Sequence, residues 1–200
     1  MRFEHLGTVP RVHAEAVVAP TAVISGDVTV SVGCQILHGA VITSEGSPIT
    51  IGEHTIVMEN AIIRASAVHA AHIGSHVLVG PMASVSGAVV DDEVYLATGS
   101  RVVNGAHVGR GSLVRTNAVV HLRTVVPENT VVPLGWVAIG DPVQLLPADE
   151  AEAISAVHAE LDFPGFVFGL DRSAPDYMVQ LTERYGAALA RHALDRRVDG

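Results

Sequence analysis

Aliphatic residues recur at every sixth position along most of this chain. Glycine or small polar residues lie between these anchors, as in "IGEHTI" and "IGSHVL". One buried aliphatic side chain followed by a tight corner produces a short strand and a turn. The anchors form four series: Val18, Ile24, Val30, Ile36 and Ile42; Ile51, Val57 and Ile63; Ile73, Val79 and Val85; and Val90, Leu96, Val102, Val108, Val114, Val120, Val126 and Val132.

A six-residue period predicts a left-handed parallel β-helix. Three such units close a triangular coil of about 18 residues. Neighbouring coils pair as parallel strands roughly 4.8 Å apart, so equivalent residues of successive coils stack in ladders. A β-sandwich with valine-rich strands, the alternative, would not hold one phase through eight consecutive units. We therefore expect an all-β domain of hexapeptide repeats over residues 10–147.

Three changes of phase interrupt the period. The segment "TSEGSP" adds three residues between Ile42 and Ile51, and "RASAVHAAH" adds four between Ile63 and Ile73. Because the anchors resume in phase, these additions are predicted to bulge outward as loops. The step from Val85 to Val90 is one residue short, which predicts a shortened corner.

Residues 148–200 are predicted to form a helical tail that packs back on the β-helix. The stretch "PLGWVAIGDPVQLLP" closes the repeats, because glycine and proline punctuate turns. Two helices are then expected, in "PADEAEAISAVHAEL" and "APDYMVQLTERYGAALARHAL". Phe163, Phe166 and Phe168 lie between them, and either fix the tail to the coils or form part of a lid over a site.

Composition narrows the range of partners. The net charge is −9 and the sequence has no basic cluster, which argues against nucleic acid as a binding partner. The N-terminal residues lack the apolar core of a signal peptide, and no run approaches the roughly 20 apolar residues of a membrane span. We expect a cytoplasmic protein without a membrane partner. The single cysteine, Cys34, excludes an internal disulfide and is expected to be a small buried filler.

The β-helix segment resembles the γ-class carbonic anhydrase branch of the hexapeptide-repeat proteins, which also includes many acyltransferases. The resemblance covers roughly residues 10–147 and rests on "ILHGAVI", "IGEHTIVMENAIIR", "IGSHVLVGPMASVSGAVVDDEVYLATGS" and the closing "WVAIGDP". It implies a homotrimer with zinc at each subunit interface, held by three histidines from two chains. Such a zinc ion would activate a bound water for attack on carbon dioxide.

This chain departs from the family pattern at all three zinc positions. They are occupied by Arg64, Pro81 and Ser86. Arginine is cationic, proline has no ligand atom, and an un-ionised serine is a poor zinc donor. We therefore expect no metal at the usual family site, and no ordinary carbonic anhydrase activity. Nearby family residues are replaced too, by His38, Ala40, Met58 and Glu59.

Stacking of the coils suggests what these replacements do. His38, Glu59, Arg64, His69 and Ser86 are expected to crowd the cleft between subunits of a homotrimer. Arg64 and Glu59 either form an interfacial salt bridge, or Arg64 clamps a carboxylate or phosphate while Glu59 orients it. The first functional hypothesis is that His38, Glu59, Arg64 and Ser86 bind a small anionic metabolite.

Two further functions remain open. An acyl-CoA-dependent transferase would need one imidazole as general base, and His69 in the long loop and His121 are the candidates, with a CoA thioester as cofactor. The other is a non-catalytic trimeric scaffold. Histidine pairs could hold a metal, but each lacks an evident third ligand: His54 with His76 in adjacent coils, and His69 with His72 in the loop.

Overall fold

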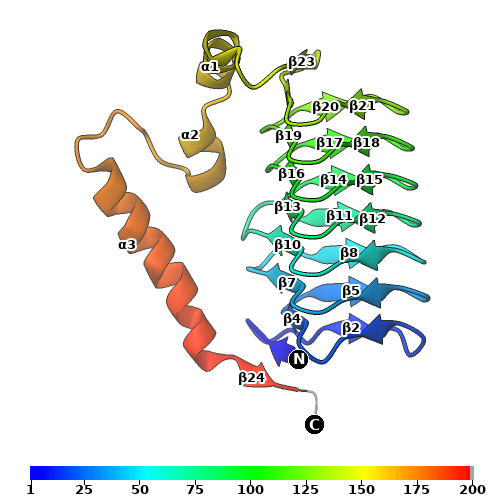
Figure 1. The fold of residues 1–200 in the computed structure, drawn as a ribbon. Coiled ribbons are helices and arrows are strands. Elements are labelled where there is room, and N and C mark those ends of the chain that lie inside the picture. The colour runs from blue at the N-terminus through cyan, green and yellow to red at the C-terminus, as the bar shows by residue number, and fades with distance from the viewer. Residues whose placement is uncertain (199–200) are drawn as a thin grey trace.

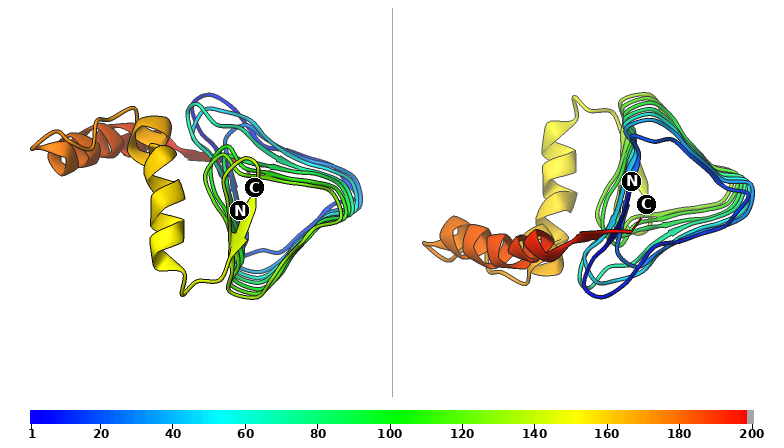
Figure 2. Two further views of the ribbon diagram at one scale, coloured as in Figure 1. Left: turned by 90° about the horizontal axis from the view of Figure 1, so that it is seen from above. Right: turned by 90° about the horizontal axis from the view of Figure 1, so that it is seen from below.

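The computed structural model describes residues 1–198, and its hexapeptide segment is a stack of coils (Figure 1) that forms a triangular prism when seen along the stack (Figure 2). Each of its three walls is a sheet of parallel strands. Each wall holds one strand from every coil, and seven coils of three strands follow one another in the described chain. The structure confirms the left-handed parallel β-helix and its helical tail. Among the described residues, no helix combines the length and apolar character needed to cross a bilayer.

We name the wall beside the tail the tail-facing wall. Its parallel strands are β1 (Arg2–Glu4), β4 (Val23–Ser25), β7 (Val41–Ser44), β10 (Ile62–Ala65), β13 (Ser84–Ser86), β16 (Arg101–Val102), β19 (Val119–Val120) and β22 (Val137–Ile139). An antiparallel strand adds to each end, β23 (Gln144–Leu146) on β22 and β24 (Arg196–Arg197) on β1. This wall is therefore longer than the others.

The second and third walls each contain seven strands among residues 1–198. The second wall is built from β2 (Arg11–Val12), β5 (Val28–Val30), β8 (Ile49–Ile51), β11 (Ala71–Ile73), β14 (Val89–Val90), β17 (His107–Val108) and β20 (Val125–Val126). The third wall is built from β3 (Val17–Val18), β6 (Gln35–Ile36), β9 (Ile56–Val57), β12 (Leu78–Val79), β15 (Tyr95–Leu96), β18 (Leu113–Val114) and β21 (Val131–Val132).

The pairing register confirms the predicted ladders. On the tail-facing wall Ile24 lies opposite Ile42, Ile42 opposite Ile63, and Ile63 opposite Val85. All four side chains are fully buried. Equivalent ladders run up the other walls, so the interior of the prism is a stack of aliphatic layers. Burying one such side chain contributes about 1.5–3 kcal/mol, and the repeat supplies this at nearly every coil.

The predicted interruptions appear where the phase changes. Residues 45–48 form a loop between β7 and β8, and residues 66–70 form a loop between β10 and β11. The two loops stack, because the Ser47 amide donates to the Ser66 carbonyl at 3.0 Å. The shortened corner lies between β13 and β14, where Gly87 is buried with φ +51°. Both loops lie at the edge of the tail-facing wall.

The tail contains α1 (Ala151–Glu160), α2 (Phe163–Phe168), α3 (Tyr177–Leu189), the 3₁₀ helix η1 (Ala190–Leu194) and strand β24. Figure 2 shows these helices outside the triangle, all beside one wall. The tail runs from β22 at one end of the prism back to β1 at the other, where Arg196 pairs with Glu4. Division at residues 10–147 and 148–200 remains a prediction, since β1 and β24 join the tail-facing wall from outside those limits.

Candidate functional site

A cavity of about 560 Å³ lies between the tail and the tail-facing wall. The wall and its loops contribute polar groups, and the tail contributes aromatic and aliphatic side chains. The lining includes Glu45, Arg64, Ser66, Ser86 and Asn104 from the prism, and Phe163, Phe166, Phe168, Leu181, Arg184, Tyr185 and Arg191 from the tail. A volume of this size suits a small ligand, since pockets for drug-sized molecules span roughly 300–1,000 Å³.

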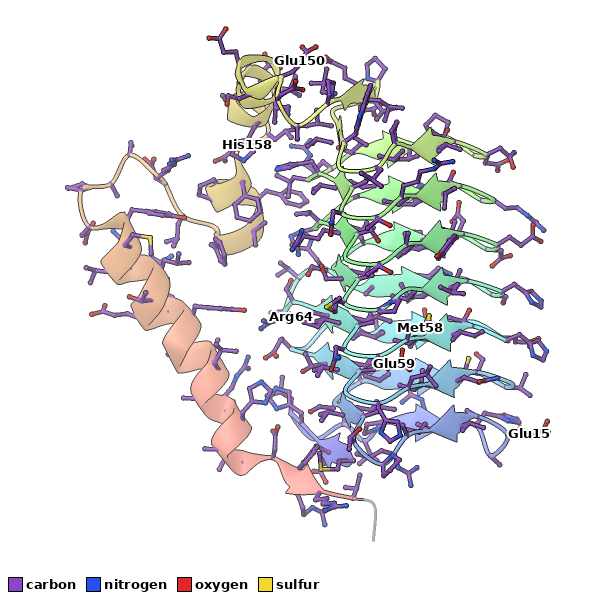
Figure 3. The ribbon with its side chains drawn as sticks, viewed as in Figure 1. Glu15, Met58, Glu59, Arg64, Glu150 and His158 are labelled. Carbon is purple, nitrogen blue, oxygen red and sulfur yellow. The ribbon has the colours of Figure 1, made fainter. Side chains whose placement is uncertain are left out.

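Arg64 and Ser86 lie side by side in this cavity. They are paired residues of β10 and β13, so the sheet register itself brings them together. Both are half-buried. Arg64 Nη2 is 3.4 Å from Glu45 Oε1, and the guanidinium carbon lies 5.5 Å from the centre of the Tyr185 ring. Figure 3 shows Arg64 at the edge of the prism beside the tail.

The ionisable lining of the cavity is mainly cationic. Arg64, Arg184 and Arg191 line it, against a single carboxylate, Glu45. This balance is the reverse of that of the whole chain, whose net charge is −9. Guanidinium groups around an apolar cavity favour ligands that carry negative charge.

The phenylalanine cluster fixes the tail and also lines the cavity. The Phe166 ring stacks on His69 with centroids 4.5 Å apart, and the Arg123 guanidinium lies 5.5 Å from its centre. Phe168 contacts both Phe163 and Tyr185, each at 5.9 Å between centroids. The two interpretations of this cluster are therefore compatible, because Phe166 attaches α2 to the prism while all three rings face the cavity.

His69 lies in the predicted loop, and its imidazole is engaged by the tail. Its Nε2 is 3.1 Å from the Phe166 carbonyl oxygen. A carbonyl only accepts hydrogen bonds, so Nε2 carries the proton and Nδ1 is left as the basic atom of the neutral ring. His69 lies outside the cavity lining, although Ser66, Ala67 and Val68 of its loop belong to it.

His121 follows β19, near the β22 end of the tail-facing wall, and contacts His158 of α1. Burial lowers the pKa of this imidazole, and the charge of His158 lowers it further. The two rings meet edge to face, with centroids 5.0 Å apart. His121 Nδ1 accepts the Leu122 amide proton at 2.8 Å. The structure therefore does not bring His121 together with His69 or Arg64, and its neutral form is favoured.

His38 and Glu59 lie at the opposite edge of the tail-facing wall from Arg64. They occupy the corners before β7 and β10, whereas Arg64 lies near the end of β10. Figure 3 labels Glu59 and Arg64 at separate places on the prism. His38 is exposed and its Nδ1 is 2.7 Å from Thr21 Oγ1. A single chain therefore gathers Arg64 and Ser86 but not His38 and Glu59.

The two histidine pairs have different neighbours. His54 and His76 stack as the repeat predicts, with ring centroids 5.3 Å apart. His72 instead bonds to Thr50 Oγ1 at 2.6 Å, away from His69. Among residues 1–198, neither pair belongs to a group of three potential metal ligands. Cys34 is buried as expected, and burial raises the pKa of its thiol.

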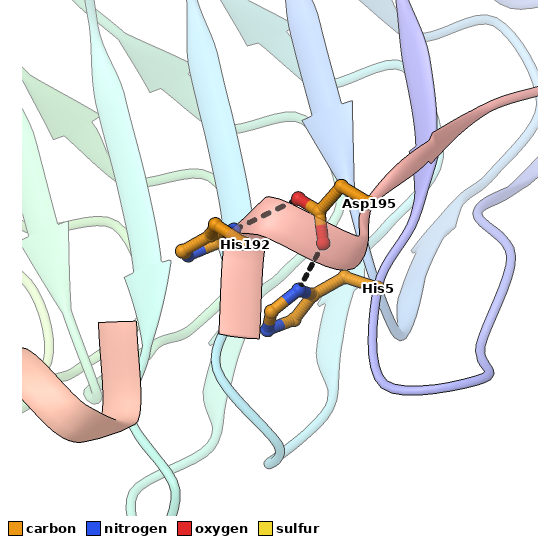
Figure 4. A group of neighbouring side chains, drawn as sticks. All are labelled: His5, His192 and Asp195. Atoms are coloured by element: carbon orange, nitrogen blue, oxygen red, sulfur yellow. Dashed lines mark hydrogen bonds and ion pairs between the residues drawn. The ribbon is translucent and has the colours of Figure 1, made fainter. Parts of the chain in front are cut away.

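A cluster that the sequence did not predict joins the two ends of the chain. His5 and His192 stack with ring centroids 4.2 Å apart, and Asp195 lies beside both rings (Figure 4). Asp195 Oδ1 is 2.5 Å from His5 Nδ1, and Oδ2 is 2.8 Å from His192 Nδ1. Glu45 Oε1 is 3.1 Å from His192 Nε2 on the other side. Residues 5 and 195 are far apart in the sequence and meet only in the folded chain, so no local sequence motif could predict this cluster.

The carboxylates shift the ionisation of this cluster. The hydrogen bond to Asp195 raises the pKa of His192, against a smaller effect of burial, and Glu45 adds to the rise. Burial alone would raise the pKa of Asp195, but hydrogen bonds from His192 and His5 outweigh it and hold that pKa below its usual range. The raised pKa favours the protonated form of His192, whose two ring nitrogens contact the carboxylates of Asp195 and Glu45 where the tail meets the prism.

The comparisons with known proteins agree with this architecture. No family model matches the chain. Two curated relatives from Arabidopsis thaliana are mitochondrial γ carbonic anhydrases: number 1 is 30% identical over 102 residues and number 3 is 34% identical over 95 residues. These matches cover 48% and 44% of this chain, and only 37% of each relative. The chain is a hexapeptide-repeat protein that resembles the γ carbonic anhydrases.

Solved structures place the hexapeptide-repeat protein in the same fold. A Bacillus cereus protein described as a candidate acetyltransferase superimposes with a TM-score of 0.62 at 21% identity, covering 79% of this chain and 90% of that one. A hexapeptide transferase family protein from Anaplasma phagocytophilum gives a TM-score of 0.51 at 18% identity, covering 96% and 93%. At these identities the likeness concerns the fold alone.

Proposed function

We propose that this hexapeptide-repeat protein binds a small organic anion in the cavity between the tail and the tail-facing wall. The observation that carries the proposal is the half-buried Arg64 guanidinium on the cavity wall, beside Ser86. A guanidinium pairs with a carboxylate or phosphate through two parallel N–H···O bonds. The Ser86 hydroxyl can donate a third hydrogen bond to the same group.

The rest of the lining suits an anion with an apolar body. Phe163, Phe168 and Tyr185 offer aromatic faces, and Arg184 and Arg191 add positive charge at the tail side. A carboxylate or phosphate monoester attached to an aromatic ring or a short alkyl chain would use both parts of the cavity. Glu45, which contacts Arg64, would orient the guanidinium as the anion approaches.

The proposal includes a homotrimer that has lost the usual zinc site of its relatives. The residues at the three family positions, Arg64, Pro81 and Ser86, supply no imidazole. His38 and Glu59, on the far side of the wall from the cavity, are proposed to face a neighbouring subunit. In this proposal the chain shares ancestry with the γ carbonic anhydrases but not their activity.

Isothermal titration with benzoate, hexanoate and phenyl phosphate tests the anion site. We expect at least one of these probes to bind, and Arg64→Gln to weaken it roughly ten- to a hundredfold, as for a lost charge-assisted pair. Arg115→Gln is the matched control, because Arg115 is an exposed arginine outside the cavity lining. Failure of every probe to bind, or equal weakening in both variants, would contradict the proposal.

An acyl-CoA-dependent O- or N-acyltransferase is the second candidate, favoured by the basic Nδ1 that His69 keeps while its Nε2 donates to the Phe166 carbonyl. His69 Nδ1 would take the proton of the attacking hydroxyl or amine, which bonds to the thioester carbonyl carbon as the CoA thiolate leaves. Thermal stabilisation by acetyl-CoA, without any by the carboxylates, would favour this function. The same screen without any response would favour the trimeric scaffold.

A further inference from the structure

We propose that His5, His192 and Asp195 bind one divalent transition-metal ion of the zinc type, which joins the two ends of the chain. Each residue offers one ligand atom, and these atoms all lie within 4.8 Å of one another. His5 follows β1, whereas His192 and Asp195 precede β24, so the site closes where the tail returns to the prism (Figure 4). This inference does not depend on the anion site.

The donor set is one that zinc and its neighbours prefer. Two imidazole nitrogens and one carboxylate oxygen suit Zn²⁺, Co²⁺ or Ni²⁺, and leave a position for water. The His5 side chain is 1% exposed, whereas those of Asp195 and His192 are 16% and 34% exposed. The site is therefore dry on the prism side and open on the tail side, where an ion and its water can enter.

Glu45 supplies the outer support that histidine ligands normally have. Its Oε1 is 3.1 Å from His192 Nε2, and its Oε2 is 3.8 Å from His5 Nε2. His5 Nε2 is buried without a hydrogen-bond partner. A carboxylate beside the outer nitrogen holds the proton there, which leaves the Nδ1 lone pair available for a metal. Glu45 does this for His192, and Arg64 contacts Glu45 in turn. On the His5 side Glu45 stands close enough for an ion pair but not for a hydrogen bond.

The geometry requires only a small adjustment. His5 Nδ1 and His192 Nδ1 now lie 2.5 and 2.8 Å from Asp195 oxygens. Tetrahedral zinc with ligand bonds of about 2.0–2.1 Å separates its ligands by about 3.3 Å, so each nitrogen would part from its Asp195 oxygen by less than about 1 Å. The three ligand atoms already lie within 4.8 Å of one another. The ion would take the place of the protons that these groups now share.

Metal titration of the untagged chain tests the site. The protein is stripped with EDTA, desalted and titrated with Zn²⁺ by calorimetry and with Co²⁺ by visible absorption. We expect one ion per chain. Asp195→Asn and His192→Gln should weaken Zn²⁺ binding by at least about tenfold, and Glu45→Gln by roughly ten- to a hundredfold. Bound Zn²⁺ should also slow amide exchange in residues 190–198.

His54→Gln is the control, because His54 belongs to a stacked pair without a nearby carboxylate ligand set. It should leave the affinity unchanged. Circular dichroism checks folding, and Asp195→Asn, which keeps the shape of the side chain, carries the test if His192→Gln unfolds. The proposal is overturned if no stoichiometric Zn²⁺ binds, or if the control variant weakens binding as much as Asp195→Asn.

Discussion

At the scale of single residues, the corners of the prism depend on left-handed backbone conformations. Glycines occupy many of these positions, but several other residues adopt them too. The non-glycine corner residues with positive φ include His54, Asn60, His76, Met82, Glu93, Asn117, Arg123 and Asn129. Such a conformation costs a residue with a Cβ roughly 1–2 kcal/mol, so the fold tolerates this cost at several coils. Glycines are needed mainly where a neighbour also approaches closely.

Gly105 is such a position, and Gly105→Ala is predicted to loosen the tail. Its φ is +73°, and an added Cβ would lie 2.8 Å from the Phe166 ring. Gly135 has φ +70° with nothing within 4 Å, so Gly135→Ala isolates the backbone cost. Urea unfolding should show a loss of about 1–2 kcal/mol for Gly135→Ala and about 2–4 kcal/mol for Gly105→Ala. Equal losses would show that Phe166 does not pack firmly on this corner.

His121 gives stability a pH dependence of predictable sign. Its folded pKa is lowered by burial and by His158, so the unfolded chain binds this proton more readily. The contribution is therefore complete above the unfolded pKa of about 6.5 and is lost as the pH falls through that value toward the folded pKa. His121→Asn, whose amide oxygen can still accept the Leu122 N–H, should remove this dependence.

The measurement compares the two proteins in urea between pH 5 and 7.5. The stability difference between wild type and His121→Asn should shift in favour of the variant as the pH falls. Comparing the two proteins cancels the opposite effect of His192, whose raised pKa gives stability that is lost as the pH rises. A difference that stays constant across this range would contradict the assignment.

At the scale of elements, the sequence determines the strands far better than the tail. Each anchor occupies the same place in its coil, so one register predicts every wall, and the pairs Ile42–Ile63 and Ile63–Val85 follow directly from counting. The same counting placed Arg64 beside Ser86. Periodicity could do this because a β-helix makes contacts mainly between coils one turn apart.

Counting along the repeat could not predict the contacts of the tail. The helices α1 and α3 form where the sequence predicts them, but α3 buries no residue, so its pattern could not reveal what it faces. The β24–β1 pairing and the contacts of His5 with Asp195 join residues about 190 positions apart. The proposed anion cavity needs both the wall and the tail. Counting predicted the wall side, whereas for the tail the sequence left only two alternatives for Phe163, Phe166 and Phe168, an attachment to the coils or a lid over a site.

At the scale of the whole molecule, the chain is predicted to assemble as a homotrimer. Solvent-exposed aliphatic and aromatic side chains remain on all three walls, including Val17, Ile62, Val89, Tyr95 and Val125. Exposed apolar side chains on the walls favour contacts with neighbouring subunits. Multi-angle light scattering should give three times 20.9 kDa, about 63 kDa, at micromolar concentration. A mass of about one chain would contradict the assembly.

Reversing the charge of Glu59 should weaken the trimer, whereas the same change at Glu53 should not. Glu59 lies half-buried in the corner between the third and tail-facing walls, where the subunit boundary is proposed. Glu53 is exposed in the corner between the second and third walls, in the same coil. Glu59→Arg places a cation beside the boundary and should shift the mass toward the monomer, whereas Glu53→Arg should remain trimeric. Since both variants change the net charge equally, dissociation of both would mean that overall charge governs assembly, and would remove Glu59 from the boundary.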